Sequence, residues 1–175
     1  MTVSLSSQIV ADWRAHGRDW TKPGFRAVAV HRFGVWRMTI RPKLLRAPFS
    51  IVYGFLFRHC RNHYGIELPY TVKLGRDVVV EHQGAIVVHG ACEIGNGCII
   101  RQGCTLGLRR LDDLTAAPIL GEDVELGAGA VILGRIRLGN GVRVGANAVV
   151  LDDVPAGATV WGIPATVTHP PATGG

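Results

Sequence analysis

The sequence contains 175 residues, of which 47% are hydrophobic and 18% charged, and its formal net charge is +6. This length predicts one compact domain with a sizeable core, plus at most a small appendage. No apolar run reaches the roughly 18 residues that cross a bilayer, because Arg46, Ser50 and Arg58 interrupt the best candidate, from Leu44 to Cys60. The first residues also lack the basic and apolar regions of a signal peptide. We therefore expect a cytoplasmic protein.

The positive charge is concentrated in the first 66 residues. These contain eleven Lys or Arg and only two acidic residues, whereas the remainder contains eight basic and eleven acidic residues. Such asymmetry suits an anionic partner, either an acidic glycan or a phospholipid surface to which the protein associates peripherally. A nucleic acid is not expected, since no nucleic-acid-binding motif is present. A solvated helical face explains the same charge pattern without any partner, and we prefer that interpretation.

Residues 1–66 are predicted to form a small α-helical segment. Ser7 is placed to cap the first helix, Pro42 ends the second, and Gly65 is suited to terminate the third. The predicted helices span about 7–17 and 25–40, and the third begins at about Lys43 or Pro48 and ends at His63. We expect them to cover one open end of the structure that follows, where strand edges would otherwise be unpaired.

A period of six dominates the chain from Leu68 to Trp161. Neither a helix, with a repeat of 3.6, nor a flat strand, with a repeat of 2, has this period, which is typical of a parallel β-helix with three hexads per coil. We therefore predict an all-β left-handed parallel β-helix over 67–168, followed by a disordered tail over 169–175 whose Pro, Thr and Gly-rich composition begins at Thr166. The predicted inward column is Leu68, Leu74, Val80, Ile86, Cys92, Cys98, Cys104, Leu120, Leu126, Ile132, Leu138, Val144, Val150 and Ala156.

The column breaks once, between Cys104 and Leu120. Sixteen residues separate these two positions where six are due, so ten residues are expected to loop out within 108–118. A protruding loop on a rigid scaffold is a common place for a binding site.

Three cysteines, Cys92, Cys98 and Cys104, occupy successive positions of this column, one on each face of a single coil. We expect their thiols to converge near the axis and to pack as small hydrophobic side chains. A trapped metal ion is a minor alternative, because no fourth ligand is evident, and we expect no metal. Cys60 lies in the helical segment and has no evident role.

His82 is the main candidate for acid–base chemistry. It lies outside the inward column, next to Glu81 and near Glu67, and a carboxylate bonded to one ring nitrogen leaves the other nitrogen free to take a proton. A surface histidine without a function explains the spacing equally well. His89 has the same ambiguity, and nothing around it favours a role.

From Gly65 to Ala165 the chain resembles the catalytic domain of the serine acetyltransferase family of hexapeptide acyltransferases. A segment upstream, with Pro23-Gly-Phe25, Ala27 and His31-Arg32, resembles the family's helix before the repeat. The stretches that carry the resemblance are Gly65-Ile-Glu-Leu-Pro69, Lys73-Leu-Gly75, Glu81-His82 with Gly84-Ala-Ile-Val-Val88, Cys104-Thr-Leu-Gly107, Leu126-Gly-Ala-Gly-Ala130, Ile132-Leu-Gly134, Val144-Gly-Ala146 and Gly162-Ile-Pro-Ala165.

The resemblance implies a role for each matching residue. His82 corresponds to the general base, which deprotonates an acceptor hydroxyl that attacks acetyl-CoA directly, and Glu67 to the carboxylate that pairs with it. The implied substrate-binding residues are Glu81, Asp19 and Gln83, where the match of Asp19 needs a gap. The residues implied to line the acetyl-CoA groove, between subunits of a homotrimer, are Gly107, Ala128 and Ala146.

Two departures change the expected acceptor. The family places a second His after an Arg in the loop, and here these positions are Ala117 and Ala116. A serine carboxylate would lose a partner there. The chain is more similar to the short colanic acid type relatives that acetylate exopolysaccharide, which share its Arg101 to Gly107 segment and short helical segment. We therefore expect acetyl transfer from acetyl-CoA to a saccharide hydroxyl.

Three other functions are weighed against this one. A serine O-acetyltransferase is the nearest alternative. A metalloprotein of the γ-carbonic anhydrase type requires an H-x4-H pair, whereas His82 and His89 are seven residues apart. A non-catalytic assembly subunit would bind no coenzyme A.

Overall fold

The computed structural model describes residues 4–168. Three helices, α1 (Leu5–Ala15), α2 (Pro23–Arg37) and α3 (Lys43–His59), come first, and α3 continues into a π-helical turn, η1 (Cys60–Tyr64). Gly65, with a φ of 63°, ends this turn as predicted, whereas the cap of α1 is Ser4 and not Ser7. None of the helices in the described range is long and apolar enough to span a bilayer.

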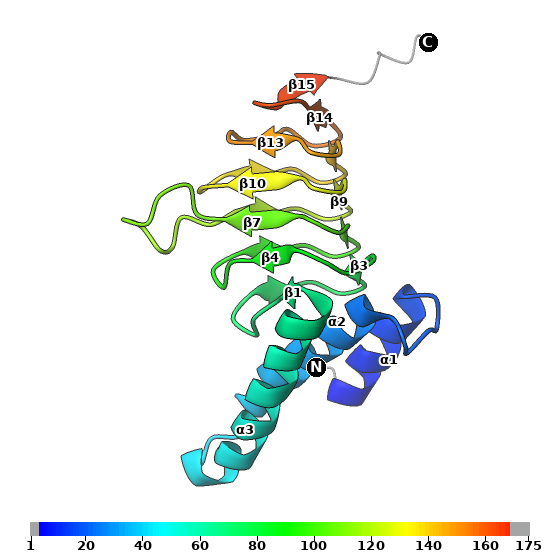
Figure 1. Cartoon of the computed structure of the whole chain (residues 1–175), viewed down its shortest axis with the longest axis vertical. Helices are drawn as coiled ribbons and strands as arrows, with labels where there is room; N and C mark the ends of the chain where they lie inside the picture. Colours follow the sequence, from blue (N-terminus) through cyan, green and yellow to red (C-terminus); the bar gives the residue numbers. More distant parts are fainter. Residues whose placement is uncertain (1–3, 169–175) are drawn as a thin grey trace.

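The rest of the described chain winds into a left-handed parallel β-helix, which confirms the predicted fold class (Figure 1). Its three faces are three sheets, in which all strands pair in parallel except β15. Sheet A contains β1 (Ile66–Glu67), β4 (Ile86–Val88), β7 (Thr105–Gly107), β10 (Val131–Leu133) and β13 (Val149–Val150). Sheet B contains β2 (Lys73–Leu74), β5 (Glu93–Ile94), β8 (Ile119–Leu120) and β11 (Arg137–Leu138). Sheet C contains β3 (Val79–Val80), β6 (Ile99–Ile100), β9 (Glu125–Leu126), β12 (Arg143–Val144), β14 (Thr159–Trp161) and β15 (Thr166–Thr168).

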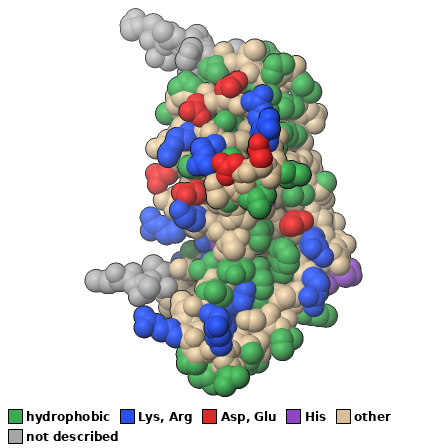
Figure 2. Space-filling view, turned by 90° about the vertical axis from the view of Figure 1, so that its left-hand side faces the viewer, with side chains coloured by type: hydrophobic (Ala, Val, Ile, Leu, Met, Phe, Trp, Pro, Cys, Tyr) green, Lys and Arg blue, Asp and Glu red, His purple; other side chains and the backbone are tan. Residues whose placement is uncertain are grey.

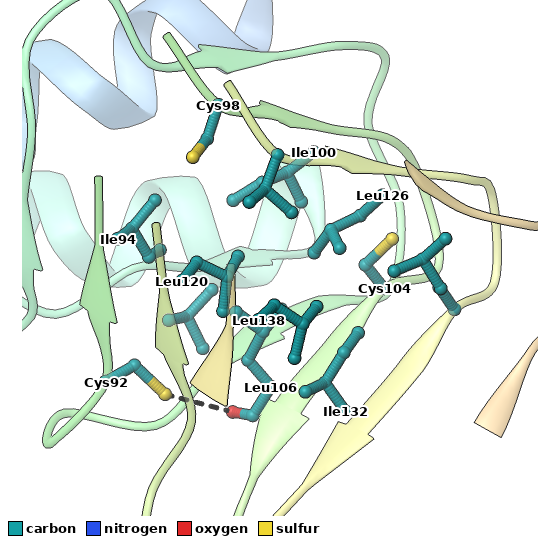
Figure 3. Close-up of a cluster of buried hydrophobic side chains, with 14 of the residues drawn as sticks. Cys92, Ile94, Cys98, Ile100, Cys104, Leu106, Leu120, Leu126, Ile132 and Leu138 are labelled. Carbon is teal, nitrogen blue, oxygen red and sulfur yellow. Dashed lines mark hydrogen bonds between the residues drawn. The ribbon is translucent and has the colours of Figure 1, made fainter. Parts of the chain in front are cut away.

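The core fills the axis of this prism. Side chains alternate between the two faces of a strand, so two positions per hexad point inward. The larger residue occupies the middle of each face, and a smaller one lies two residues earlier, near the corner. Among the fully buried larger residues are Ile100, Leu106, Leu126, Ile132 and Leu138, which stack over successive coils (Figure 3).

The predicted column slips by two residues at one corner, which corrects the single break expected from the sequence. Val80 pairs with Ile100 and Val87 with Thr105. Six residues, 81–86, therefore span the corner where four, 101–104, suffice in the next coil. The Glu81 amide still donates to the Ile100 carbonyl, and the Gly103 amide to that of Gly84. The two residues without a counterpart are consequently His82 and Gln83.

The protruding loop is shorter than expected for the same reason. Twelve residues, 107–118, lie between Leu106 and Ile119, where four, 89–92, lie between their partners Val88 and Glu93 in the coil below. The excess is eight residues and not ten, because two of the ten counted from the sequence belong to the corner at His82. Figure 1 shows this loop projecting from the end of β7.

The three cysteines are buried, but their thiols do not converge. They occupy the smaller inward position, and Figure 3 shows the sulfurs apart near three corners, with larger aliphatic side chains between them. Each thiol donates to a backbone carbonyl: Cys92 to Leu106 at 3.7 Å, Cys98 to Gly121 at 3.2 Å and Cys104 to Gly127 at 3.2 Å. Their prediction as core residues holds, and their convergence was wrong.

The last coil is shortened by two residues. Val154 forms a bridge with Leu138, only four positions after Val150, and Ala156 is exposed instead of pointing inward. The strand β15 then runs antiparallel to β14, so Thr166–Thr168 are not part of an irregular tail. The predicted tail over 169–175 lies outside the described residues.

Buried polar side chains join the helices to the first coil. The edge carbonyls of this coil accept from His31, which reaches Val72 at 2.9 Å, and from Arg32, which reaches Leu74 at 2.9 Å. Arg32 also forms a buried ion pair with Asp12, with Nε and Oδ2 2.8 Å apart. The helices thus satisfy strand-edge groups that would otherwise lack partners.

Candidate active site

His82 lies on the corner that leads from sheet C to sheet A, in the two-residue insertion. Its side chain is exposed and its φ is 68°. Five other non-glycine residues in the described chain adopt this left-handed region, so the φ alone does not mark His82 as functional. Neither the core nor the strand ladder uses His82, which leaves its imidazole available to a ligand.

A cavity of about 210 Å³ opens beside His82, where the start of α2 meets β3. Gly24 makes this close approach possible, because a Cβ at this position would overlap the Val80 carbonyl oxygen. The cavity is lined by His16, Lys22, Pro23, Gly24, Val79, Val80, Glu81 and His82. Both acidic and basic groups therefore face a space large enough for part of a small acceptor.

His16 was not identified from the sequence, although it lies in the wall of this cavity. Its Nδ1 donates to the Asp12 carbonyl at 2.7 Å, and its Nε2 accepts from the Val80 amide at 3.2 Å. Both nitrogens are occupied, and burial lowers the pKa of this ring below 6.5. His16 is thus a neutral support between α1 and β3. Nothing in the sequence indicates this contact, because it joins His16 to a backbone amide 64 residues further along the chain.

The His82 ring forms no hydrogen bond within residues 4–168, and the structure does not join it to Glu67. Glu67 lies on β1, opposite Val87 in the next coil, and is half-buried. The strand that follows the His82 corner therefore begins directly above β1. The predicted pairing remains a prediction, because the hydrogen bonds of catalytic groups often tighten only when substrate binds.

The three predicted substrate-binding residues are placed differently. Glu81 lines the cavity and pairs with Arg101 in the coil above, at 3.3 Å between Oε2 and Nε. Gln83 is exposed beside His82. Asp19 instead accepts from Thr21 in a surface turn, at 2.8 Å to its amide, and these hydrogen bonds lower the pKa of Asp19. Asp19 is not among the residues that line the cavity.

Two of the predicted coenzyme A residues stack above the His82 corner. The Gly103 amide donates to Gly84, the Gly129 amide to Gln102, and the Asn147 amide to Ala128. Ala128 and Ala146 therefore occupy this corner two and three coils above His82, at heights of about 10 and 14 Å, given the spacing of about 4.8 Å between strands. Gly107 does not belong to this corner, because it ends β7 at the opposite edge of sheet A.

The loop over 108–118 also leaves from that opposite edge. Asp113 accepts from Arg135 at 2.9 Å, and the loop borders a cavity of about 580 Å³ that Arg109, Arg110 and Ala116 also line. Ala117 is buried. Within one chain, the width of sheet A separates the loop from His82, so the structure does not bring these two parts of the predicted site together.

Burial makes the cysteines poor nucleophiles. It raises the pKa of Cys92 to about 12 and those of Cys98 and Cys60 to about 11, so the reactive thiolate is scarce near neutral pH. Residues 4–168 contain no group of three or more His, Cys, Asp or Glu side chains arranged to hold a metal ion.

Comparison with known proteins identifies relatives of two kinds. Residues 117–152 match a family model described as bacterial transferase hexapeptide (six repeats). The chain is similar to the serine acetyltransferase of Synechocystis sp., with 35% identity over 95% of this chain and 68% of the relative. It is also similar to WcaB of Escherichia coli K12, whose name describes a colanic acid biosynthesis acetyltransferase, with 39% identity over 78% of this chain and 83% of the relative.

The fold is similar to that of the crystal structure of Brucella abortus serine acetyltransferase in complex with coenzyme A. The TM-score is 0.79 at 26% identity, covering 94% of this chain and 67% of the other. The chain spans 57% of the length of the Synechococcus elongatus serine acetyltransferase that it matches. The similarity to the Synechocystis and Brucella proteins extends over the helices as well as the coils of this chain. The chain therefore belongs to the serine acetyltransferase family of bacterial hexapeptide transferases.

Proposed function

We propose that this protein transfers the acetyl group of acetyl-CoA to a hydroxyl group of a saccharide. The observation that carries this proposal is the His82 insertion, which holds an exposed, unbonded imidazole beside a cavity and below a corner of small residues. An imidazole titrates near neutral pH and suits a general base that takes the proton of an attacking hydroxyl.

Acetyl-CoA is the proposed donor. A family member is described as a complex with coenzyme A, and Ala128 and Ala146 leave room along the corner above His82 for an extended ligand. Attack on the thioester is direct, because the cysteines are buried and carry raised pKa values. No acetyl-enzyme intermediate is therefore required. We propose Gly107 as a donor contact from the far edge of sheet A.

A saccharide is the proposed acceptor because the loop lacks cations at two decisive places. Ala116 and Ala117 stand where serine-acetylating relatives are expected to carry Arg and His, and leaving a carboxylate unpaired in a partly buried site is costly. The neutral hydroxyls of a sugar require only hydrogen bonds, which Glu81 and Gln83 can supply. The similarity to WcaB over 83% of its length supports the same acceptor class.

L-Serine is the second candidate acceptor. Lys22 lines the cavity next to His82, and its ammonium group could bind a carboxylate in place of the missing loop residues. Relatives named serine acetyltransferase support this alternative. Lys22 also suits an acidic sugar, so its presence does not separate the two candidates.

We propose a homotrimer with active sites between subunits. His82 and the loop lie at opposite edges of sheet A, so a neighbouring copy packed on this sheet could bring its loop to His82. The outward ladder of sheet A is also nearly uncharged above Glu67, with Val87, Thr105, Val131 and Val149 in register. Sheets B and C expose ion pairs instead, Lys73 with Glu93 and Arg143 with Glu125.

We also propose a cytoplasmic location, which suits the four free cysteines.

The test is coenzyme A release with acetyl-CoA and a panel of acceptors that contains neutral sugars, uronic acids and L-serine. We expect saccharides to exceed L-serine at least about tenfold in kcat/KM, equivalent to about 1.4 kcal/mol of transition-state binding. His82→Ala should reduce kcat by about 10²–10⁴ without changing the melting temperature. His89→Ala is the matched control, since His89 also lies on the solenoid wall and should remain near wild-type activity.

Each alternative has a distinct outcome. L-Serine as the best acceptor would replace the saccharide proposal with the second candidate. A His82→Ala variant within about threefold of wild type would remove His82 as the base. Failure of the wild type to bind coenzyme A in calorimetry would exclude both transferase functions.

A further inference from the structure

Helix α3 is apolar on two opposite faces. The inner face packs on α2, where Trp36 and Phe49 lie edge to face with ring centroids 5.4 Å apart. Tyr53 is buried on the same side and carries the Arg37 guanidinium over its ring at 4.4 Å. This inner face is thus fully explained by packing within the chain.

The outer face has no such explanation. Leu44, Ile51 and Phe55 recur at helical spacing and are 89%, 73% and 66% exposed. Leu45 and Val52, at 64% and 49% exposed, widen the same stripe. Figure 1 shows α3 extending away from the β-helix, and nothing in the described part of the chain covers this stripe. An exposed apolar surface of this kind marks a contact with a partner or a membrane.

The charges around the stripe are all positive. The segment over 20–66 contains nine Lys or Arg and no Asp or Glu. Exposed cations flank both ends of the stripe, with Arg41 and Lys43 before it and Arg58 and Arg61 after it. Figure 2 shows hydrophobic and basic side chains together over the helical end of the molecule.

This charge pattern decides between the possible occupants. A second copy packed through the same stripe would place cations against cations, with no acidic group on the segment to pair with them. An anionic surface complements both features at once, since apolar side chains enter the acyl boundary and Lys and Arg bind the phosphates. The absence of a bilayer-spanning helix among the described helices is consistent with a surface position.

We propose that the outer face of α3 docks the protein peripherally on an anionic phospholipid bilayer. Leu44, Ile51 and Phe55 enter the interface, and Arg41, Lys43, Arg58 and Arg61 contact lipid phosphates. The β-helix then stands away from the bilayer, because its first coil begins where η1 ends. This inference does not depend on the acceptor proposed above, since it concerns only binding.

The test is flotation of the full chain with vesicles of phosphatidylcholine containing about 30% phosphatidylglycerol, compared with vesicles of phosphatidylcholine alone. We expect the protein to float with the anionic vesicles and to be released partly as salt is raised. The triple variant Leu44→Gln, Ile51→Gln, Phe55→Gln should bind at least about tenfold more weakly. Leu111→Gln with Leu114→Gln is the control, because it removes two exposed leucines elsewhere and should float like wild type.

Circular dichroism and size-exclusion light scattering on each variant keep the result interpretable. The triple variant should retain the wild-type spectrum and mass, because its three side chains are largely exposed. Wild type that stays with the vesicle-free fraction would overturn the proposal. So would a triple variant that floats like wild type, or one that loses subunits, since the stripe would then be a contact between copies. None of these readouts uses catalysis, so they remain separate from the test of acetyl transfer.

Discussion

Buried histidines make the junction between the helices and the first coil sensitive to pH. His31 donates through Nε2 to the Val72 carbonyl, and its Nδ1 is buried without a partner in the described chain. Desolvation lowers the pKa of His31 from 6.5 to about 4. Between these values the unfolded chain binds a proton that the folded chain excludes. The stability that neutral His31 contributes is therefore complete above pH 6.5 and is lost as the pH falls towards 4.

We accordingly expect wild type to lose roughly 2–3 kcal/mol through His31 between about pH 7 and about pH 4.5. His31→Gln keeps a neutral donor for Val72 and should make the pH dependence correspondingly shallower. Urea unfolding at the two pH values measures the difference. If His31→Gln kept the full wild-type slope, the lost stability would have another origin.

At the scale of single residues, the sequence singled out His82 through the resemblance of Glu81-His82 to the family motif, and its role as a base stays a prediction. Asp12, His16 and Arg32 were not recognised as structural, because each acts through a contact to a backbone group or side chain distant in the sequence. Hydrophobic periodicity carries no information about such contacts.

The repeating element was predicted correctly, and its register was wrong only from Ile86 to Cys104 and at Ala156. Positions two residues apart both point inward, and both are apolar in this chain. The column through Ile86 and the cysteines therefore looks as regular as the true one through Val88, Ile94, Ile100 and Leu106. Only backbone pairing distinguishes them, and it places the extra residues at His82 and Gln83.

This assignment predicts the effect of removing the insertion. Deleting His82 and Gln83 should leave Glu81-Gly84-Ala85 to form the same corner as Arg101-Gln102-Gly103 above it. We expect the variant to fold with a melting temperature within a few degrees of wild type, and to lose acetyl transfer by at least about 10². Thermal denaturation and coenzyme A release would measure the two effects. A deletion variant that unfolds would show that the corner is part of the scaffold after all.

At the scale of the whole molecule, the two parts of the proposed site do not meet within one chain. His82 stands at one edge of sheet A and the loop at the other. Hexad spacing alone does not indicate the edge of a sheet at which an inserted residue lies, because backbone pairing decides where each strand begins and ends. Which edge each segment occupies follows only from the three-sheet topology. The proposed trimer would explain why the two parts are built on opposite edges.

Subunit mixing tests the trimer. His82→Ala and Gly107→Trp should each be inactive alone, the second because a large side chain would block the proposed donor contact at the opposite edge of sheet A. If the base and the far edge of one site come from different subunits, co-expression with random mixing should restore one site in each mixed trimer, or about a quarter of all sites. Light scattering should confirm that both variants assemble. No recovery in verified mixed trimers would place both groups of a site on the same chain.

The departures from the hexad rule all fall on corners. They are the two residues gained at His82, the eight gained in the loop and the two lost before Val154. Strand pairing continues on either side of each, so the length of a corner changes without removing a stacked strand. In such a protein, substrate preference can diverge through insertions and deletions while the prism keeps its stability. Relatives with different acceptors are then expected to differ more in corner length than in the residues that fill the axis.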